Sequence, residues 1–231
     1  MSNIVKIIIG VIVAGFAGFG VWAYVVENSS NIDYEQYDLN VIHEGDAASG
    51  GISDHVKGNA DAKVLIFEYA DYQCSGCATV SPWLEELIEE YDGEVAIVYR
   101  SFLLSYHTNA KAAASAVEAA GLQGYWQEYG NYLFENQADW YYATVNTRTD
   151  LFASYFEEVT GGEGDVKQFR KDLASTEVAK KVSFDVNLAK RVNIEATPTL
   201  VINGEVLDWY DNNTKAGFLE FMRKAIAAAQ E

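Results

Sequence analysis

Cys74 and Cys77 are the only cysteines of this chain, and they lie where a predicted strand passes into a predicted helix. The apolar run over residues 63–70 is typical of a buried strand, and the pattern after Cys77 is helical as far as about residue 91. This junction places a Cys-x-x-Cys pair at the start of a helix, which restricts both the fold and the chemistry.

The start of a helix changes the chemistry of a thiol. Unpaired backbone N–H groups and a partial positive charge stabilise a thiolate there, so we expect a lowered pKa for Cys74. Cys77 lies about one turn further on and on the same face, within reach of a sulfur bonded to Cys74. Ser75 and Gly76 add little bulk and leave Cys74 accessible. Cys74 is therefore predicted to be the attacking thiol and Cys77 the resolving thiol.

Two other interpretations of the cysteine pair stay open. A zinc site needs four ligands, and with no further cysteine it would have to recruit His43, His55 or His107, none of which shows ligand spacing. A purely structural disulfide would close a very small loop, so its stabilising effect would be modest. Neither is favoured over a redox-active pair.

Four features follow one another in order along residues 54–231. They are Asp71-x-x-Cys74-x-x-Cys77 after the strand, Pro82 inside the next helix, residues 102–107 followed by an alanine-rich helix and Gln123-Gly124-Tyr125-Trp126, and Ala196-Thr197-Pro198-Thr199 before a further strand. In this order and spacing, the chain resembles the membrane-anchored DsbA-like thiol–disulfide oxidoreductases of the thioredoxin superfamily. The resemblance implies an α/β thioredoxin fold, in which helices flank a central mixed sheet and a helical domain is inserted at about residues 108–187.

The resemblance also implies roles for residues far from the cysteines in sequence. Pro198 matches the family's cis-proline, which lies beside the Cys-x-x-Cys pair and counts among the catalytic residues. Thr197 and Pro198 would offer backbone for substrate pairing and keep other groups away from Cys74. Ser75 and Gly76 are predicted to complete the substrate-binding surface. An ordinary loop proline before a strand is the open alternative for Thr197-Pro198.

Glu68 is a carboxylic acid within an otherwise apolar strand, six residues before Cys74. In the superfamily that the chain resembles, a buried carboxylate at this place assists proton transfer to and from the resolving cysteine. Burial would raise its pKa, which suits acid–base catalysis near neutral pH. The alternative is that Glu68 faces solvent at the end of the strand.

Two departures from the family pattern leave the direction of electron flow open. Gln73 precedes Cys74 where thioredoxins carry tryptophan. The dipeptide Ser75-Gly76 is neither the Pro-His of strong oxidases nor the Gly-Pro of reductases. Because this dipeptide tunes the redox potential, the resemblance alone does not decide between oxidase and reductase.

An uncharged apolar run covers residues 7–26, and its twenty residues match the length of a membrane-spanning helix. It continues through Trp22 and Tyr24 without a convincing small-residue cleavage site, which favours an uncleaved anchor over a cleaved signal peptide. Lys6 before the run favours an N-terminus on the cytoplasmic side. We therefore predict an anchor over residues 1–29, a polar linker over 30–53 and an extracytoplasmic thioredoxin-like domain over 54–231.

The remaining sequence is consistent with one folded domain. Nearly half of the residues are hydrophobic, and the net charge of −18 argues against a nucleic-acid partner. Hydrophobic periodicity and Asn/Gly breaks predict a second strand, five helices, a hairpin around Asn203-Gly204 and a closing helix. These elements are expected over residues 94–102, then 109–120, 125–136, 151–159, 166–175 and 177–192, then 199–202 with 205–207, and finally 215–230.

Together these observations predict a dithiol oxidase that introduces disulfides into exported proteins through Cys74 and Cys77. No cofactor besides this redox-active disulfide and no metal is expected. The expected partners are exported proteins with cysteine pairs and, by resemblance, a DsbB- or VKOR-like membrane protein that restores the disulfide. The alternatives are a disulfide reductase or isomerase, and a metal-binding module similar to a copper chaperone on the same fold.

Overall fold

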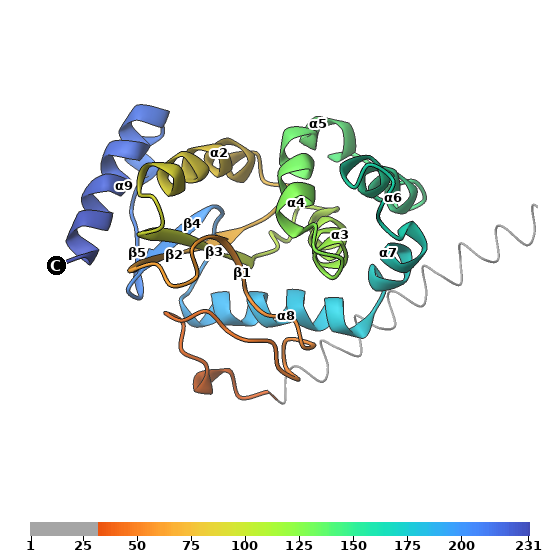
Figure 1. Cartoon of the computed structure of the whole chain (residues 1–231), viewed down its shortest axis with the longest axis horizontal. Helices are drawn as coiled ribbons and strands as arrows, with labels where there is room; N and C mark the ends of the chain where they lie inside the picture. The colour runs from red at the N-terminus through yellow and green to blue at the C-terminus, as the bar shows by residue number, and fades with distance from the viewer. Residues whose placement is uncertain (1–31) are drawn as a thin grey trace, which may run out of the picture.

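A five-stranded mixed sheet forms the centre of the protein, whose computed structural model describes residues 32–231 (Figure 1). The strand order is β1-β3-β2-β4-β5. Strands β2 and β3 run parallel, and the other neighbouring pairs are antiparallel. The strands are β1 (His55–Gly58), β2 (Val64–Ala70), β3 (Val95–Ser101), β4 (Thr199–Ile202) and β5 (Glu205–Val206).

The two central strands are buried on both faces, as their continuous apolar runs predict. Helices α2 (Ser75–Glu90) and α9 (Lys215–Ala229) cover one face, where Leu84 and Phe218 pack against Ile66 and Ile97. Helix α8 (Thr176–Arg191) runs along the other face (Figure 1). The predicted mixed sheet flanked by helices is therefore confirmed.

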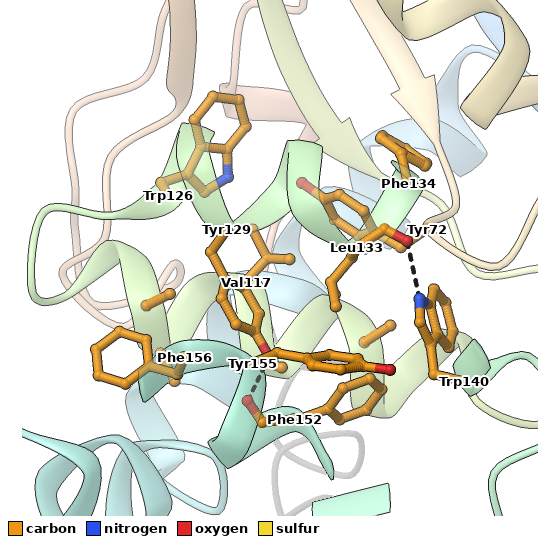
Figure 2. Close-up of a cluster of buried hydrophobic side chains, with 14 of the residues drawn as sticks. Tyr72, Val117, Trp126, Tyr129, Leu133, Phe134, Trp140, Phe152, Tyr155 and Phe156 are labelled. Atoms are coloured by element: carbon orange, nitrogen blue, oxygen red, sulfur yellow. Dashed lines mark hydrogen bonds between the residues drawn. The ribbon is translucent and has the colours of Figure 1, made fainter. Parts of the chain in front are cut away.

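Five helices follow β3 and pack together beside the sheet (Figure 1). Its core is aromatic: Tyr129, Phe152, Phe156 and Trp140 are all buried within it (Figure 2). The Tyr129 hydroxyl donates to the Phe152 carbonyl at 2.8 Å, and Trp140 Nε1 donates to the Leu133 carbonyl at 2.8 Å. These bonds satisfy the polar ends of large rings inside an apolar core. The helices are α3 (Ala110–Gly121), α4 (Trp126–Glu135), α5 (Gln137–Trp140), α6 (Arg148–Val159) and α7 (Val166–Asp172).

The segment before β1 lies against the sheet instead of standing away from it as the predicted linker would. Its 3-10 helix η1 (Tyr34–Gln36) leads into residues whose carbonyls reach a buried guanidinium. Arg100 on β3 donates to the carbonyls of Leu39 at 3.0 Å and Val41 at 2.9 Å, and it forms an ion pair with Asp54 at 2.8 Å. This part of the predicted linker is thus fixed to the domain by hydrogen bonds to its backbone.

Several predictions about elements need comment. The predicted anchor lies outside the described residues; within residues 32–231 no helix combines the length and hydropathy that crossing a membrane requires. The sequence did not predict strand β1 or the short helix α5. A second 3-10 helix, η2 (Tyr210–Asn212), stands between the β4–β5 hairpin and α9. The domain boundaries stay a prediction.

Candidate active site

The two cysteines lie at the junction of β2 and α2, as the sequence predicts. Cys74 is the residue that caps the N-terminus of α2, and its backbone N–H donates to the Asp71 carbonyl at 2.9 Å. Cys74 is half-buried, whereas Cys77, one turn along, is fully buried. Both thiols are free in this structure. The Cys74 sulfur is therefore partly accessible to a reactant, whereas the Cys77 sulfur is shielded from solvent.

The surroundings of the two sulfurs shift their pKa values in opposite directions. The Cys77 thiol, then Thr197, and then the backbone N–H groups of Cys77 and Gly76 lower the pKa of Cys74 to about 5 by hydrogen bonding, against the opposing effect of burial. Burial raises the pKa of Cys77 well above its ordinary value. A thiol of low pKa is the better leaving group, so the pair is chemically asymmetric in the sense predicted.

The Thr197–Pro198 segment lies directly beside this pair, just before β4. The Thr197–Pro198 peptide bond is cis, and the Cys74 thiol donates to the Thr197 carbonyl at 3.3 Å. Gly76 packs so closely here that an added Cβ would lie 3.2 Å from Pro198 Cδ and 3.6 Å from Cys74 Sγ. The structure thus brings Thr197, Pro198 and Gly76 together around Cys74.

Ser75 and Tyr210 border the same region. Ser75 is exposed in the first turn of α2, and its carbonyl accepts a hydrogen bond from the Thr79 hydroxyl at 2.9 Å. Tyr210 on η2 donates to the Pro198 carbonyl at 3.3 Å, a contact that the sequence did not indicate. The roles of Ser75, Gly76, Thr197 and Pro198 in binding a substrate stay predictions.

Glu68 is buried within β2, so the solvent-facing alternative is wrong. Its Oε1 has no hydrogen-bond partner, and burial raises the pKa of Glu68 to about 7, although the Lys57 ammonium group opposes the rise. The Glu68 carboxylate in turn contributes to the raised pKa of Cys77, after burial and the neighbouring Cys74. The charge of this buried carboxyl therefore acts on the resolving thiol, and a pKa raised to about 7 suits proton transfer near neutral pH.

Lys57, whose charge acts on Glu68, forms its own hydrogen bonds with residues of two helices. The Lys57 amine, itself buried on β1, donates to Glu85 at 2.7 Å and to Asn131 at 2.8 Å. Glu85 is on α2 and Asn131 on α4, so the group joins the sheet to both helices. Sequence reasoning missed Lys57 because the strand that carries it is short and polar.

Gln73 and Asn109 form a second connection that the sequence analysis missed. Both side chains are buried, and the Gln73 carboxamide accepts from the Asn109 N–H at 2.6 Å and donates to the Tyr141 carbonyl at 2.8 Å. Asn109 in turn donates to the carbonyls of Tyr141 and Ala143. Hydrogen bonds of Gln73 and Asn109 therefore link the cysteine loop with the helices that follow β3.

The sequence matches a family model and several curated proteins. Residues 51–223 match the family model described as Thioredoxin. Among curated proteins, the Na(+)/H(+) antiporter NhaA 1 of Mycolicibacterium vanbaalenii is 33% identical over 154 residues, which cover 65% of this chain and 23% of the antiporter. The NhaA 1 protein of Mycolicibacterium gilvum is 34% identical over 155 residues, 66% of this chain and 24% of that protein. The chain spans about a quarter of the length of these curated relatives.

Solved structures share the fold at low sequence identity. BdbD from Bacillus subtilis superposes with a TM-score of 0.63 and 21% identity, over 84% of this chain and 99% of that protein. DsbA from Chlamydia trachomatis gives a TM-score of 0.59 and 17% identity, over 76% of this chain and 90% of that protein. The matched family model covers most of the described residues, and the sheet order and the cysteine site lie within it, so the chain belongs to the thioredoxin family.

Proposed function

We propose that this protein is a thiol–disulfide oxidoreductase, and specifically a dithiol oxidase that introduces disulfides into exported proteins. The observation that carries the proposal is the contrast between the two sulfurs: Cys74 is half-exposed with a pKa of about 5, and Cys77 is buried with a raised pKa. A structural disulfide does not require this contrast, whereas thiol–disulfide exchange uses it at each step.

The oxidase cycle begins with the Cys74–Cys77 disulfide. A substrate thiolate attacks Cys74 Sγ, the Cys74–Cys77 bond breaks, and Cys77 leaves as a thiolate that takes the proton held by Glu68. A second substrate thiolate then attacks the substrate sulfur of the mixed disulfide, and Cys74 leaves as a thiolate. The substrate has lost two electrons and gained a disulfide, and the enzyme holds two reduced cysteines.

The low pKa of Cys74 supports the oxidising direction. Stabilising the thiolate stabilises the reduced enzyme, and a stable reduced form makes the disulfide a stronger oxidant. The attacking cysteine has a pKa of about 3.5 in strongly oxidising DsbA and of about 7 in reducing thioredoxin, and the value of about 5 for Cys74 lies between them. We therefore favour oxidation over reduction or isomerisation.

The location and partners of the protein are further parts of the proposal. The apolar run over residues 7–26 would anchor the chain in the cell membrane as a single span, with the catalytic domain on the extracytoplasmic side. Its substrates would be exported proteins with cysteine pairs. A DsbB- or VKOR-like membrane protein would accept the two electrons and restore the Cys74–Cys77 disulfide.

The test is the oxidation of a reduced, unfolded secreted protein by the purified, oxidised full-length chain. One disulfide should form in the substrate for each enzyme disulfide consumed, and Cys74→Ala should abolish the reaction. Cys77→Ala cannot form the Cys74–Cys77 disulfide, so it should not oxidise the substrate either. When oxidised glutathione is added, this variant should instead retain a mixed disulfide between Cys74 and glutathione, because the resolving thiol is missing. Reduction of insulin without oxidation of the substrate would favour a reductase, and stoichiometric copper binding without exchange would favour a metal-binding module.

A further inference from the structure

Asp71 lies at the centre of the turn that presents both cysteines. Its backbone carbonyl accepts the Cys74 N–H at 2.9 Å, and its backbone N–H donates to the Cys77 sulfur at 3.5 Å. One carboxylate oxygen accepts the Gln73 N–H at 2.8 Å. The backbone and side chain of this one residue therefore bond to each end of the Cys-x-x-Cys pair and to the residue before it.

The second carboxylate oxygen of Asp71 is bound to the loop that follows β3. It accepts the Leu104 N–H at 3.0 Å and lies 2.9 Å from His107 Nδ1. An ionised carboxylate only accepts, so His107 Nδ1 carries the proton in this contact. The Asp71 side chain is 0% exposed and the His107 side chain 7% exposed. The pair is thus a closed connection between the cysteine turn and a distant loop.

We propose that Asp71 and His107 are a positioning pair for the cysteine site: the imidazole donates to the buried Asp71 carboxylate, and the carboxylate holds the Gln73 and Leu104 N–H groups in the arrangement that presents Cys74. This inference rests on the proposed function, because it assigns a role in thiol reactivity. The Asp71 and His107 side chains touch neither sulfur, so they act through the backbone that they hold.

The Asp71 carboxylate accepts hydrogen bonds from three donors, which an ionised carboxylate can do without donating a proton itself. Burial raises the pKa of Asp71, and the Leu104 and Gln73 N–H groups and His107 oppose the rise. A protonated carboxyl would become a donor at one oxygen and could not accept from all three groups. Two backbone N–H groups would then compete for one oxygen, and a buried donor left unpaired costs about 1–3 kcal/mol. Loss of the imidazole donor therefore loosens the turn.

Charge and geometry predict opposite results, which makes the proposal testable. The titratable group in contact with the Asp71 carboxylate is His107 from the loop after β3, whereas Cys74 and Cys77 at the start of α2 bond to the Asp71 backbone. A carboxylate acting only through its charge would disfavour the Cys74 thiolate, so its removal would lower the pKa of Cys74. A carboxylate that positions the turn favours the thiolate, so its removal would raise that pKa.

The experiment measures the pKa of Cys74 in the full-length chain from the pH dependence of alkylation, with circular dichroism and thermal unfolding to verify the fold. His107→Phe keeps the ring and removes the donor. We expect it to raise the pKa of Cys74 by about one unit, which slows alkylation about tenfold at pH values below both pKa values. His107→Asn places an amide donor near the position of Nδ1 and should restore the wild-type pKa. Asp71→Asn should raise the pKa as well.

A second histidine–carboxylate pair in the same domain provides the matched control. His55 Nε2 lies 2.7 Å from Glu118 Oε2, and the His55 ring stacks on Trp126 at 4.5 Å, with no contact to the cysteine turn. His55→Phe keeps the stacking but removes the partner of the buried Glu118 carboxyl, so it should lower thermal stability and leave the pKa of Cys74 unchanged.

The proposal fails if folded His107→Phe leaves the pKa of Cys74 unchanged or lowers it, or if His107→Asn does not restore the wild-type value. Should Asp71→Asn fail to fold, the two His107 variants decide the question alone. A wild-type Cys74 with an ordinary pKa and no disulfide exchange would instead overturn the proposed function, so the two failures are distinguishable.

Discussion

Glu68 is a single buried carboxyl whose raised pKa makes the stability of the protein depend on pH. Its pKa in the folded protein is raised to about 7 by burial, above its ordinary value of about 4.3 in an unfolded chain. Between these two pH values the folded protein holds the proton and the unfolded chain has lost it. Stability therefore falls as pH rises through this window, and above pH 7 the full cost of the charged, buried form remains.

We predict that Glu68→Gln stabilises the protein at pH 8 by up to about 3 kcal/mol, because the neutral amide removes the cost of an ionised carboxyl. The same change should slow thiol–disulfide exchange, since Cys77 loses the neighbouring group that moves its proton. Urea unfolding at pH 4 and pH 8 and stopped-flow exchange measure the two effects. The exposed Glu89 on α2 provides the control Glu89→Gln, which should alter neither. Faster exchange in Glu68→Gln would contradict the role given to this carboxyl.

The residue scale also marks where sequence reasoning stops. The spacing of Cys74 and Cys77 and the apolar surroundings of Glu68 were sufficient to predict a lowered pKa for Cys74 and the burial of Glu68, whereas the attacking role of Cys74 stays a prediction. The contact between Asp71 and His107 was not predictable in the same way, because 36 residues and a strand separate them. Only the pairing of β2 with β3 brings the loops after these two strands together.

At the scale of elements, the first turn of α2 and the segment before β4 form one packed unit. Gly76 lies at their contact, where a Cβ would stand 3.2 Å from Pro198 Cδ, closer than ordinary van der Waals contact. The position therefore needs glycine for space rather than for backbone conformation. Any side chain here would displace either the Pro198 ring or the start of the helix that carries Cys74.

We predict that Gly76→Ala lowers the rate of thiol–disulfide exchange by roughly tenfold, because a shift of a few tenths of an ångström misplaces the Cys74 sulfur. Stability should change little, since overpacking costs about 1–3 kcal/mol and alanine is favoured over glycine in a helix by about 1 kcal/mol. Exchange kinetics and thermal unfolding give the two numbers. Glu89→Gln, at an exposed position further along α2, is the control. Equal rates in Gly76→Ala and the wild type would contradict close packing at this contact.

Elements with strong periodicity were predictable, and the short polar ones were not. Strands β2 and β3 read as continuous apolar runs, and the structure places their ends within one residue of the predicted bounds. Strand β1 has the sequence His55-Val56-Lys57-Gly58, which shows no apolar alternation. Its Lys57 is nevertheless buried, because Glu85 and Asn131 satisfy the ammonium group inside the fold. Such burial depends on partners that no local pattern reveals.

For the whole molecule, a buried charge network fixes the segment before β1 to the rest of the domain. Asp54 pairs with Arg100 at 2.8 Å and with Lys181 at 2.9 Å, and all three side chains are 0% exposed. Lys181 and Arg100 hold the pKa of Asp54 well below its usual range, against the effect of burial. The polar composition of the segment suggested a tether, and the buried Arg100 guanidinium binds the carbonyls of two of its residues, Leu39 and Val41.

We predict that Asp54→Asn destabilises the protein by about 3–5 kcal/mol, because the buried Arg100 loses its carboxylate partner and the buried Lys181 keeps only Asp185. Asp54 has a depressed pKa in the folded protein, so its contribution is fully present above about pH 4, its range in an unfolded chain, and is lost as pH falls through the folded value. Urea unfolding between pH 3 and pH 7 measures this dependence. Glu94→Gln, which removes an exposed ion pair with Lys63, should change stability little. An Asp54→Asn protein as stable as the wild type would contradict the role of the network.

The account as a whole depends on the redox character of the Cys74–Cys77 pair, so the most direct test is its reduction potential. The full-length chain would be equilibrated with glutathione buffers and the fraction of disulfide measured. Because the Cys74 thiolate is stabilised, we predict an oxidising potential, towards roughly −120 mV. A value near roughly −270 mV, typical of reducing thioredoxins, would contradict the oxidase function, and the roughly 150 mV between the two corresponds to about 7 kcal/mol for two electrons.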